Sequence, residues 1–295
     1  MNANENNEYQ QWLGKTEHAE DTIASQPAAA LAATLDKLEF DARIGQPLPL
    51  AWHWIYFHSL APASGLGVEG HQRLGGFLPP IPLPRRMWAG SRLKFHHPIL
   101  IGDHLQRHST IADITLKQGR SGPLAFVKVQ HGYHRDGICV LDEEHDIVYR
   151  EAINPNDKSA KKAPPIPAPT TSEWTKTIHP EPILLFRYSA LIFNAHRIHY
   201  DRSYCKDVEG YPGLVVHGPL IATLLLDLIT TSQPKPVSSF NFRALAPVFD
   251  TEDFSVSGCS TKDSNHELWA VNAQGELCMQ ATATTSTTNL KSPQP

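Results

Sequence analysis

Residues 186–220 read FRYSALIFNAHRIHYDRSYCKDVEGYPGLVVHGPL, and they place three histidines and an asparagine directly upstream of an apolar segment. That segment, residues 220–229, is hydrophobic nearly all round, which predicts a helix buried inside a larger body. Groups that can move protons therefore precede the start of a buried helix. This order indicates both the fold and the chemistry.

Gly218 and Pro219 mark the start of this helix. Proline suits the first helical turn, which puts Gly218 near the N-cap. Backbone N–H groups at a helix start have no intrahelical partner and lie at the positive end of the helix dipole. Glycine also lets a substrate carbonyl approach closely. The pattern predicts a place where negative charge on a thioester oxygen is stabilised, although glycine is also common at ordinary helix starts.

Four side chains just upstream, Asn194, His196, His199 and Asp201, favour acid–base chemistry. A neutral imidazole can take a proton from water and return one to carbon, and an asparagine amide can orient that water. Asp201 would orient an imidazole or cap the next helix. The HxxH spacing also occurs in metal sites, but no further ligand cluster accompanies it, so we expect no metal. A third interpretation is that these histidines only stabilise a turn.

The order of a helix followed by strands occurs twice in the chain. After the buried helix, strand patterns cover residues 238–248, 253–260 and 268–285. Upstream, residues 50–60 (LAWHWIYFHSL) predict a buried helix, with a strand as the alternative. They are followed by a predicted meander of strands over residues 92–96, 105–114, 124–133 and 138–149.

A short internal repeat supports two related halves. PILIGDHL at residues 98–105 resembles PVFDTEDF at residues 247–254, at an offset of 247 − 98 = 149. Each half is expected to wrap a curved antiparallel sheet around one apolar helix. The expected divisions are a helical N-terminal extension (1–46, with helical spacing over 17–40), a first half (47–152), a Pro-, Ala- and Lys-rich linker (153–172), a second half (173–287) and a tail (288–295).

The composition is that of a globular protein. The chain has 295 residues, 41% of them hydrophobic and 19% charged, and its net charge of -4 gives no reason to expect a nucleic-acid partner. No stretch reaches the roughly 18 apolar residues of a membrane span, and MNANENNEYQ has no features of a targeting signal. The four cysteines show no CxxC spacing. We expect reduced thiols, a cytoplasmic location and no membrane partner.

Arg85 and Arg86 end the proline-rich run LPPIPLPRR, which limits how far they can move. Guanidinium groups suit the geometry of phosphates, so the pair is a candidate phosphate clamp. The alternative is that both arginines belong to a solvated loop.

The order S-x(4)-N-x-H-x-x-H-Y-D, followed by GYPGLVVHGPL, resembles the hot-dog hydratases of the MaoC-like group. FNAHRIHYD with EGYPGLVVHGPL is similar to the branch of 3-hydroxyacyl-thioester dehydratases and of mesaconyl-CoA (C4) and itaconyl-CoA hydratases. In the first half, PLPRRMWAGSRLKF and GRSG at 119–122 show the same resemblance. It covers most of residues 50–281. It implies an α+β double hot dog in which only the second half keeps the catalytic residues.

The resemblance also implies site residues. His199 falls on the catalytic histidine of the family, Asn194 on its catalytic aspartate, and His196 on the asparagine of its motif, while His217 and Gly218 match its His-Gly pair. Asparagine cannot act as a general base. The resemblance therefore implies that His199 is the base, that Asn194 holds the water and that Gly218 serves the thioester oxygen.

The implied activity is a reversible hydratase/dehydratase that adds water to the 2,3 double bond of an enoyl-CoA thioester, in particular a small branched dicarboxylic acyl-CoA. No cofactor is implied, the partner is the acyl-CoA, and a homo-oligomer such as a dimer is compatible with it. His196, Arg197, Asp201 and His217 would support the site. Candidates for coenzyme A phosphates are Arg85 and Arg86, and candidates for a substrate carboxylate are Arg187, Arg197 and Arg243.

Three other activities stay open. They are a 3-hydroxyacyl-ACP or -CoA dehydratase of fatty acid metabolism, a hot-dog acyl-CoA thioesterase and a non-catalytic acyl-CoA-binding module. A thioesterase usually needs a carboxylate on or beside the buried helix to activate water at the carbonyl. Asp227 is the only acid within residues 220–229 and lies well inside the segment, which argues against that activity.

Overall fold

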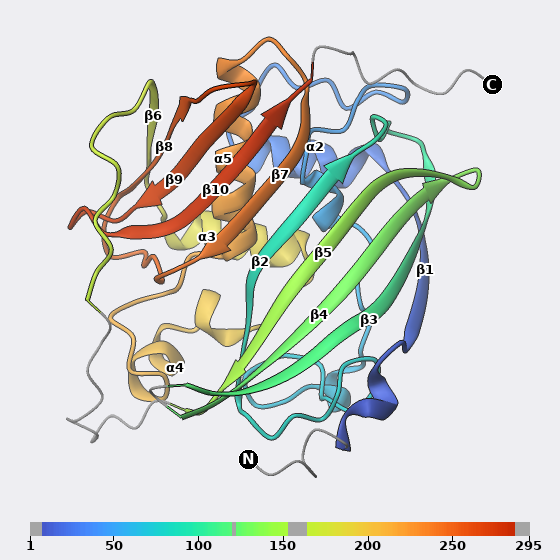
Figure 1. The fold of residues 1–295 in the computed structure, drawn as a ribbon, viewed down its shortest axis with the longest axis vertical. Coiled ribbons are helices and arrows are strands. Elements are labelled where there is room, and N and C mark those ends of the chain that lie inside the picture. The colour runs from blue at the N-terminus through green and yellow to red at the C-terminus, as the bar shows by residue number, and fades with distance from the viewer. Residues whose placement is uncertain (1–7, 120–121, 153–163, 287–295) are drawn as a thin grey trace.

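The computed structural model of the chain describes residues 8–119, 122–152 and 164–286. Its main feature is one ten-stranded antiparallel sheet in the order β1-β3-β4-β5-β2-β7-β10-β9-β8-β6 (Figure 1). The strands are β1 (Thr16–Thr22), β2 (Arg85–Phe95), β3 (His104–Gly119), β4 (Gly122–Arg135), β5 (Ile138–Arg150), β6 (Trp174–Ile178), β7 (Val237–Ala244), β8 (Phe254–Ser260), β9 (Asn265–Val271) and β10 (Leu277–Thr285).

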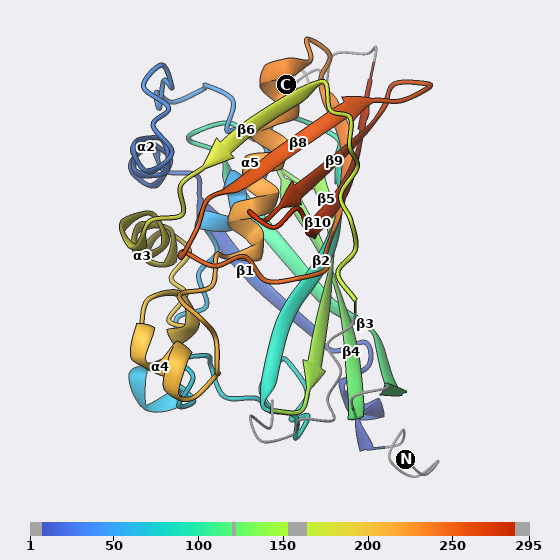
Figure 2. The same cartoon turned by 90° about the vertical axis from the view of Figure 1, so that its left-hand side faces the viewer.

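The helices lie on one side of this sheet (Figure 2). The α-helices are α2 (Ser25–Thr34), α3 (Pro182–Leu191), α4 (Arg202–Asp207) and α5 (Gly218–Ser232), and the 3₁₀ turns are Gln10–Trp12, Trp52–Ile55, Ala63–Gly65 and Arg197–His199. No helix among the described residues is long and apolar enough to cross a membrane.

The sheet consists of two halves with the same strand order. β1-β3-β4-β5-β2 forms the first half and β6-β8-β9-β10-β7 the second, and the innermost strands β2 and β7 pair with each other. Each half begins with an edge strand followed by a helix, β1 with α2 and β6 with α3. The prediction of a double hot dog is confirmed by this arrangement.

Backbone hydrogen bonds confirm the internal repeat. The Leu48 N–H donates to the Ile99 carbonyl at 2.8 Å, and the Val216 N–H donates to the Val248 carbonyl at 2.8 Å. Ile99 and Val248 are separated by 248 − 99 = 149 residues, the offset of the repeat in the sequence. The two halves are therefore related by backbone pairing as well as by strand order.

The two halves differ in what fills their curved sheets. α5 contacts all five strands of the second half, and it is buried along most of its length because its residues are nearly all apolar. Four residues beyond Leu48 the first half has only the 3₁₀ turn Trp52–Ile55, so the predicted helix over residues 50–60 is wrong. Trp52 and Trp54 pack into the core at this place. The buried Glu143 carboxylate forms hydrogen bonds of 2.9 Å with the His53 ring and with the Trp54 indole N–H.

The N-terminal region was expected to be helical over residues 17–40, and this is wrong in part. Thr16–Thr22 forms β1, an edge strand paired with β3, and only Ser25–Thr34 is helical. The boundary expected at residue 46 therefore separates elements that share one sheet. Most of the expected linker (153–163), Arg120 and Ser121 of the GRSG motif, and the tail (288–295) lie outside the described residues.

Candidate active site

The loop from α3 to α4 carries five of the predicted site residues, Asn194, His196, Arg197, His199 and Asp201. Arg197 donates from Nε and Nη2 to Asp201 Oδ2 at 3.0 and 2.8 Å, and Asp201 Oδ1 caps α4 by accepting from the Tyr204 N–H at 3.0 Å. Arg197 also donates to the Val68 carbonyl and lies over the Tyr204 ring. Both residues thus shape the loop, and Asp201 takes the capping role that was one of its two predicted alternatives.

His199 lies buried in the 3₁₀ turn that precedes α4. Its Nδ1 is 2.7 Å from the Val215 carbonyl oxygen. Because a carbonyl only accepts hydrogen bonds, Nδ1 must carry the proton and Nε2 must carry the lone pair. Burial lowers the pKa of His199 to about 4, so the ring is neutral near pH 7. A neutral imidazole with a free Nε2 is the form that a general base requires.

His217 lies face to face with His199. The two rings are stacked with centroids 3.7 Å apart, and His217 Nε2 shares a hydrogen bond of 2.8 Å with the Ser189 hydroxyl. His217 Nδ1 is buried and has no hydrogen-bond partner among the described residues. Burial lowers the pKa of His217 well below its ordinary value. Ser189 entered the sequence motif but was not predicted as a site residue.

Asn194 and His196 precede the 3₁₀ turn. Phe193 has a φ of 49°, a left-handed conformation that ends α3 and turns the chain toward the site. Asn194 Oδ1 accepts the His196 N–H at 2.9 Å, and the Asn194 side-chain nitrogen has no bond to any described residue, so it remains able to donate to a water. The His196 ring is 5.5 Å from that of His199, and burial lowers the pKa of His196 to about 3.

Gly218 is the first residue of α5, and His217 is its N-cap. A Cβ placed on Gly218 would meet nothing closer than the Trp88 carbonyl oxygen at 3.9 Å. The helix start is therefore open beside the stacked histidines. Its N–H groups can donate to a ligand oxygen, and the role predicted for Gly218 at a thioester oxygen stays a prediction.

A loop of the first half closes over these residues and was not predicted as part of the site. The His71 ring lies 4.0 Å from the His196 ring, and the Glu69 carbonyl accepts the Arg197 N–H at 2.9 Å. Gly70 has a φ of +95°, and a Cβ there would lie 1.8 Å from the Ala195 carbonyl oxygen. Only glycine fits this contact. The GHQ sequence at 70–72 gave no signal of its own, because its role depends on a contact between the two halves.

Among the described residues, the first half has a different arrangement at the matching place. Asp36 follows α2 with a φ of 54°, as Phe193 follows α3, and the next residues are Lys37 and Asn194 respectively. Lys37 forms an ion pair with Asp227 of α5. Lys37 of the first half thus occupies the position that corresponds to Asn194 of the second half.

The predicted arginines lie in different environments. Arg187 is exposed on α3 and Arg243 is exposed on β7, where its neighbour Phe242 points into the core. Arg85 pairs with Glu209 at 3.3 Å and lies over the Tyr211 ring. Arg86 lines a small surface cavity together with Glu69, Leu74 and Leu83.

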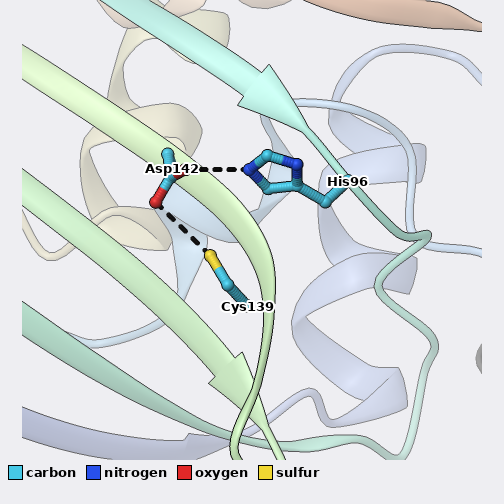
Figure 3. A group of neighbouring side chains, drawn as sticks. All are labelled: His96, Cys139 and Asp142. Atoms are coloured by element: carbon cyan, nitrogen blue, oxygen red, sulfur yellow. Dashed lines mark hydrogen bonds and ion pairs between the residues drawn. The ribbon is translucent and has the colours of Figure 1, made fainter.

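One separate cluster offers metal-ligand atoms. His96 Nε2 is 2.8 Å from Asp142 Oδ2, and the Cys139 thiol donates to Asp142 Oδ1 at 3.3 Å (Figure 3). Within the part of the chain that the structure describes, this is the one group of three such residues whose ligand atoms converge. Asp142 thus already accepts a hydrogen bond from each of the other two side chains. The histidines of the α3–α4 loop form no such group there.

Comparison with known proteins gives consistent results. Residues 51–250 match the family described as hydroxyacyl-thioester dehydratase type 2. The mesaconyl-C(4)-CoA hydratase of Chloroflexus aurantiacus is 46% identical over 278 residues, which is 92% of this chain and 95% of that protein. A MaoC-like dehydratase of Phytophthora capsici has a similar structure, with a TM-score of 0.66 at 14% identity, covering 96% of this chain and 99% of that one.

A third similar protein, from Mycobacterium tuberculosis, is described as having a double hot-dog fold. Its TM-score is 0.56 at 14% identity, and the match covers 93% of this chain and 96% of that one. The two structural likenesses show the fold, and the family match together with the bacterial relative shows the family.

Proposed function

The chain belongs to the hydroxyacyl-thioester dehydratase type 2 family of hydro-lyases, and from that premise we propose that it reversibly adds water to the 2,3 double bond of an enoyl-CoA thioester. The observation that carries the proposal is the state of His199. Its Nδ1–H is held by the Val215 carbonyl, its Nε2 is a free base, and the open start of α5 follows directly after its stacking partner His217.

In the proposed reaction, His199 Nε2 takes a proton from water while the water oxygen bonds to Cβ of the enoyl thioester. The electron pair of the double bond moves toward the thioester carbonyl, whose oxygen becomes negative. The Gly218 N–H donates to that oxygen, and the Asn194 side-chain nitrogen positions the water. The proton held by His199 then passes to Cα, which completes the addition of one water. Dehydration follows the same path in reverse.

We propose that the acyl group is small, branched and dicarboxylic, as in mesaconyl-C4-CoA or itaconyl-CoA. The support is the 46% identity to a mesaconyl-C(4)-CoA hydratase across nearly the whole of both chains. Coenzyme A phosphates would bind near Arg85, which lies opposite the half-buried Arg150 and has Glu209 as its ion-pair partner. A cytoplasmic location is part of the proposal, since all four cysteines are free thiols.

The alternatives predict different products. A thioesterase is disfavoured because Asp227, the one carboxylate on α5, is engaged by Lys37 far from the helix start. A binding module would not require the buried base and the open helix start to lie together. A dehydratase of straight-chain 3-hydroxyacyl thioesters would use the same residues and differ only in the acyl chain that it accepts.

The test mixes purified protein with crotonyl-, mesaconyl-C4- and itaconyl-CoA and follows two signals, the enoyl-thioester absorbance and the release of free thiol. The proposal expects absorbance loss without thiol release, and a product heavier by one water. Thiol release that accompanies the absorbance loss would indicate a thioesterase. Binding of the thioesters with neither signal would contradict the proposal and indicate a binding module.

A further inference from the structure

Arg85 and Arg86 are neighbours in β2 but point to opposite faces of the sheet, because side chains alternate along a strand. In the β2–β5 pairing, Arg85 lies opposite Arg150 and Arg86 opposite Tyr149. Tyr149 is completely buried, so the shared face of Arg86 and Tyr149 is the one that covers the protein interior. The side chains of the two arginines therefore leave β2 on opposite faces.

Arg85 has an anionic partner in the protein, whereas Arg86 has none. Glu209 lies 3.3 Å from Arg85 Nε. Among the described residues no carboxylate lies within ion-pair distance of Arg86, although its guanidinium is half-buried. A partly buried guanidinium without a counter-charge is costly, and an anionic ligand would offset that cost.

The Tyr149 hydroxyl is also unpartnered. It is buried and makes no hydrogen bond to any described residue. Burial raises the pKa of Tyr149, and the neighbouring Arg86 guanidinium lowers it by less, so the hydroxyl keeps its proton and can donate it to a ligand that Arg86 also contacts. A buried hydroxyl without a partner is rare in native structures. A planar fork of N–H donors and a hydroxyl donor on the same face are suited to a carboxylate.

This pair lies next to the proposed active site. The cavity that Arg86 lines is bounded by Glu69, and His71 of the same loop has its ring 4.0 Å from that of His196. Burial lowers the pKa of His71 and of His196, followed by a neighbouring histidine and then by the Arg86 charge, with Arg85 also acting on His196. The loop of Glu69 and His71 thus borders both the Arg86 cavity and the His196–His199 pair.

We propose that Arg86 and the Tyr149 hydroxyl bind the free carboxylate of the acyl group, and that this pair sets the preference for a dicarboxylic enoyl thioester. The inference rests on the proposed hydratase function and adds the residues that choose the substrate. An acyl group without a carboxylate leaves both donors unpaired, which is how a site rejects an analogue that lacks a polar group. The Glu69 side chain lines the same cavity, and its carboxylate lies 4.0 Å from His71 Nδ1.

The experiment compares kcat/KM for mesaconyl-C4-CoA and for crotonyl-CoA, which lacks the carboxylate, in Arg86→Gln, Tyr149→Phe and wild type. Losing one partner of a partly buried charged hydrogen bond predicts a loss of about 100-fold for mesaconyl-C4-CoA in Arg86→Gln. Loss of one neutral hydroxyl donor predicts about tenfold in Tyr149→Phe. Crotonyl-CoA activity should stay within about threefold in both, which also reports that each variant folds.

The matched control is Arg43→Gln, because Arg43 is exposed and its ion pair is with Asp41. It should change neither value. Equal losses on both thioesters in Arg86→Gln and Tyr149→Phe, or no loss on either, would overturn the inference. Wild type that hydrates crotonyl-CoA but not mesaconyl-C4-CoA would also overturn it while leaving the hydratase function intact. Wild type that hydrates neither would instead count against the proposed function.

Discussion

The imidazole of His199 donates its Nδ1–H to the carbonyl oxygen of Val215 at 2.7 Å. His199 lies in the loop after α3, and Val215 lies in the segment just before α5. The hydrogen bond therefore joins two segments of the motif. It fixes the tautomer of a buried ring and leaves Nε2 as the only place for a proton. The chemistry proposed for the site therefore depends on how residue 215 is held, and the Val216–Val248 backbone bond holds it.

Gly70→Ala should disrupt the site although residue 70 lies in the first half. Its Cβ would lie 1.8 Å from the Ala195 carbonyl oxygen, and its φ of +95° is strained for alanine. We expect a loss of at least about 2 kcal/mol in the free energy of unfolding and loss of hydration activity. Gly76→Ala is the control, since nothing lies within 4 Å of its added Cβ. Equal stability of the two variants in urea unfolding would contradict this contact.

Gly218→Ala should separate catalysis from stability. The added methyl would meet the protein only at 3.9 Å, so the fold should accept it, and alanine is a better helix former by about 1 kcal/mol. The methyl would occupy the approach of the thioester oxygen to the helix start. We expect kcat/KM to fall about 100-fold with the melting temperature unchanged or raised. Full activity in this variant would show that the oxygen binds elsewhere.

The buried histidines predict that stability falls in mild acid. The pKa is lowered to about 4 in His199 and to about 3 in His196, whereas an unfolded histidine titrates near about 6.5. Below about pH 6.5 the unfolded chain therefore binds more protons than the folded chain does. The stabilising contribution is complete above about pH 6.5 and is lost as the pH falls toward those folded values, by about 1.4 kcal/mol per pH unit for each histidine.

Urea unfolding at pH 7, 6 and 5 measures this slope. His196→Gln removes one of the histidines whose pKa is lowered and should make the slope shallower, with the stability of each variant at pH 7 as the reference for its series. A stability that does not change between pH 7 and pH 5 would rule out neutral burial of these rings.

Much of the second half could be predicted from local patterns. The apolar run after Pro219 predicted α5. The PILIGDHL repeat predicted an offset of 149 residues, and the backbone hydrogen bonds to the Ile99 and Val248 carbonyls show the same offset. These features follow from hydrophobic periodicity and turn chemistry, which are written in neighbouring residues. The family resemblance added the roles of His199, Asn194 and Gly218, and those roles remain proposals.

The features that were missed depend on contacts between distant residues. Residues 50–60 look like a buried helix, but His53 and Trp54 turn to Glu143, which is about ninety residues away in sequence. Thr16–Thr22 reads as part of a helix, yet it pairs with β3 at the sheet edge. The opposite directions of Arg85 and Arg86 follow from strand alternation, which became visible only once both were known to lie in β2 rather than in a loop.

The most direct test is the initial rate of hydration of crotonyl-CoA and mesaconyl-C4-CoA by wild type and His199→Ala at pH 7, with folding of the variant checked by circular dichroism. If His199 Nε2 is the base, wild type adds water to at least one thioester and the folded variant loses about 100-fold or more in kcat, because general base catalysis typically contributes that much. Undiminished hydration by folded His199→Ala would contradict the assignment.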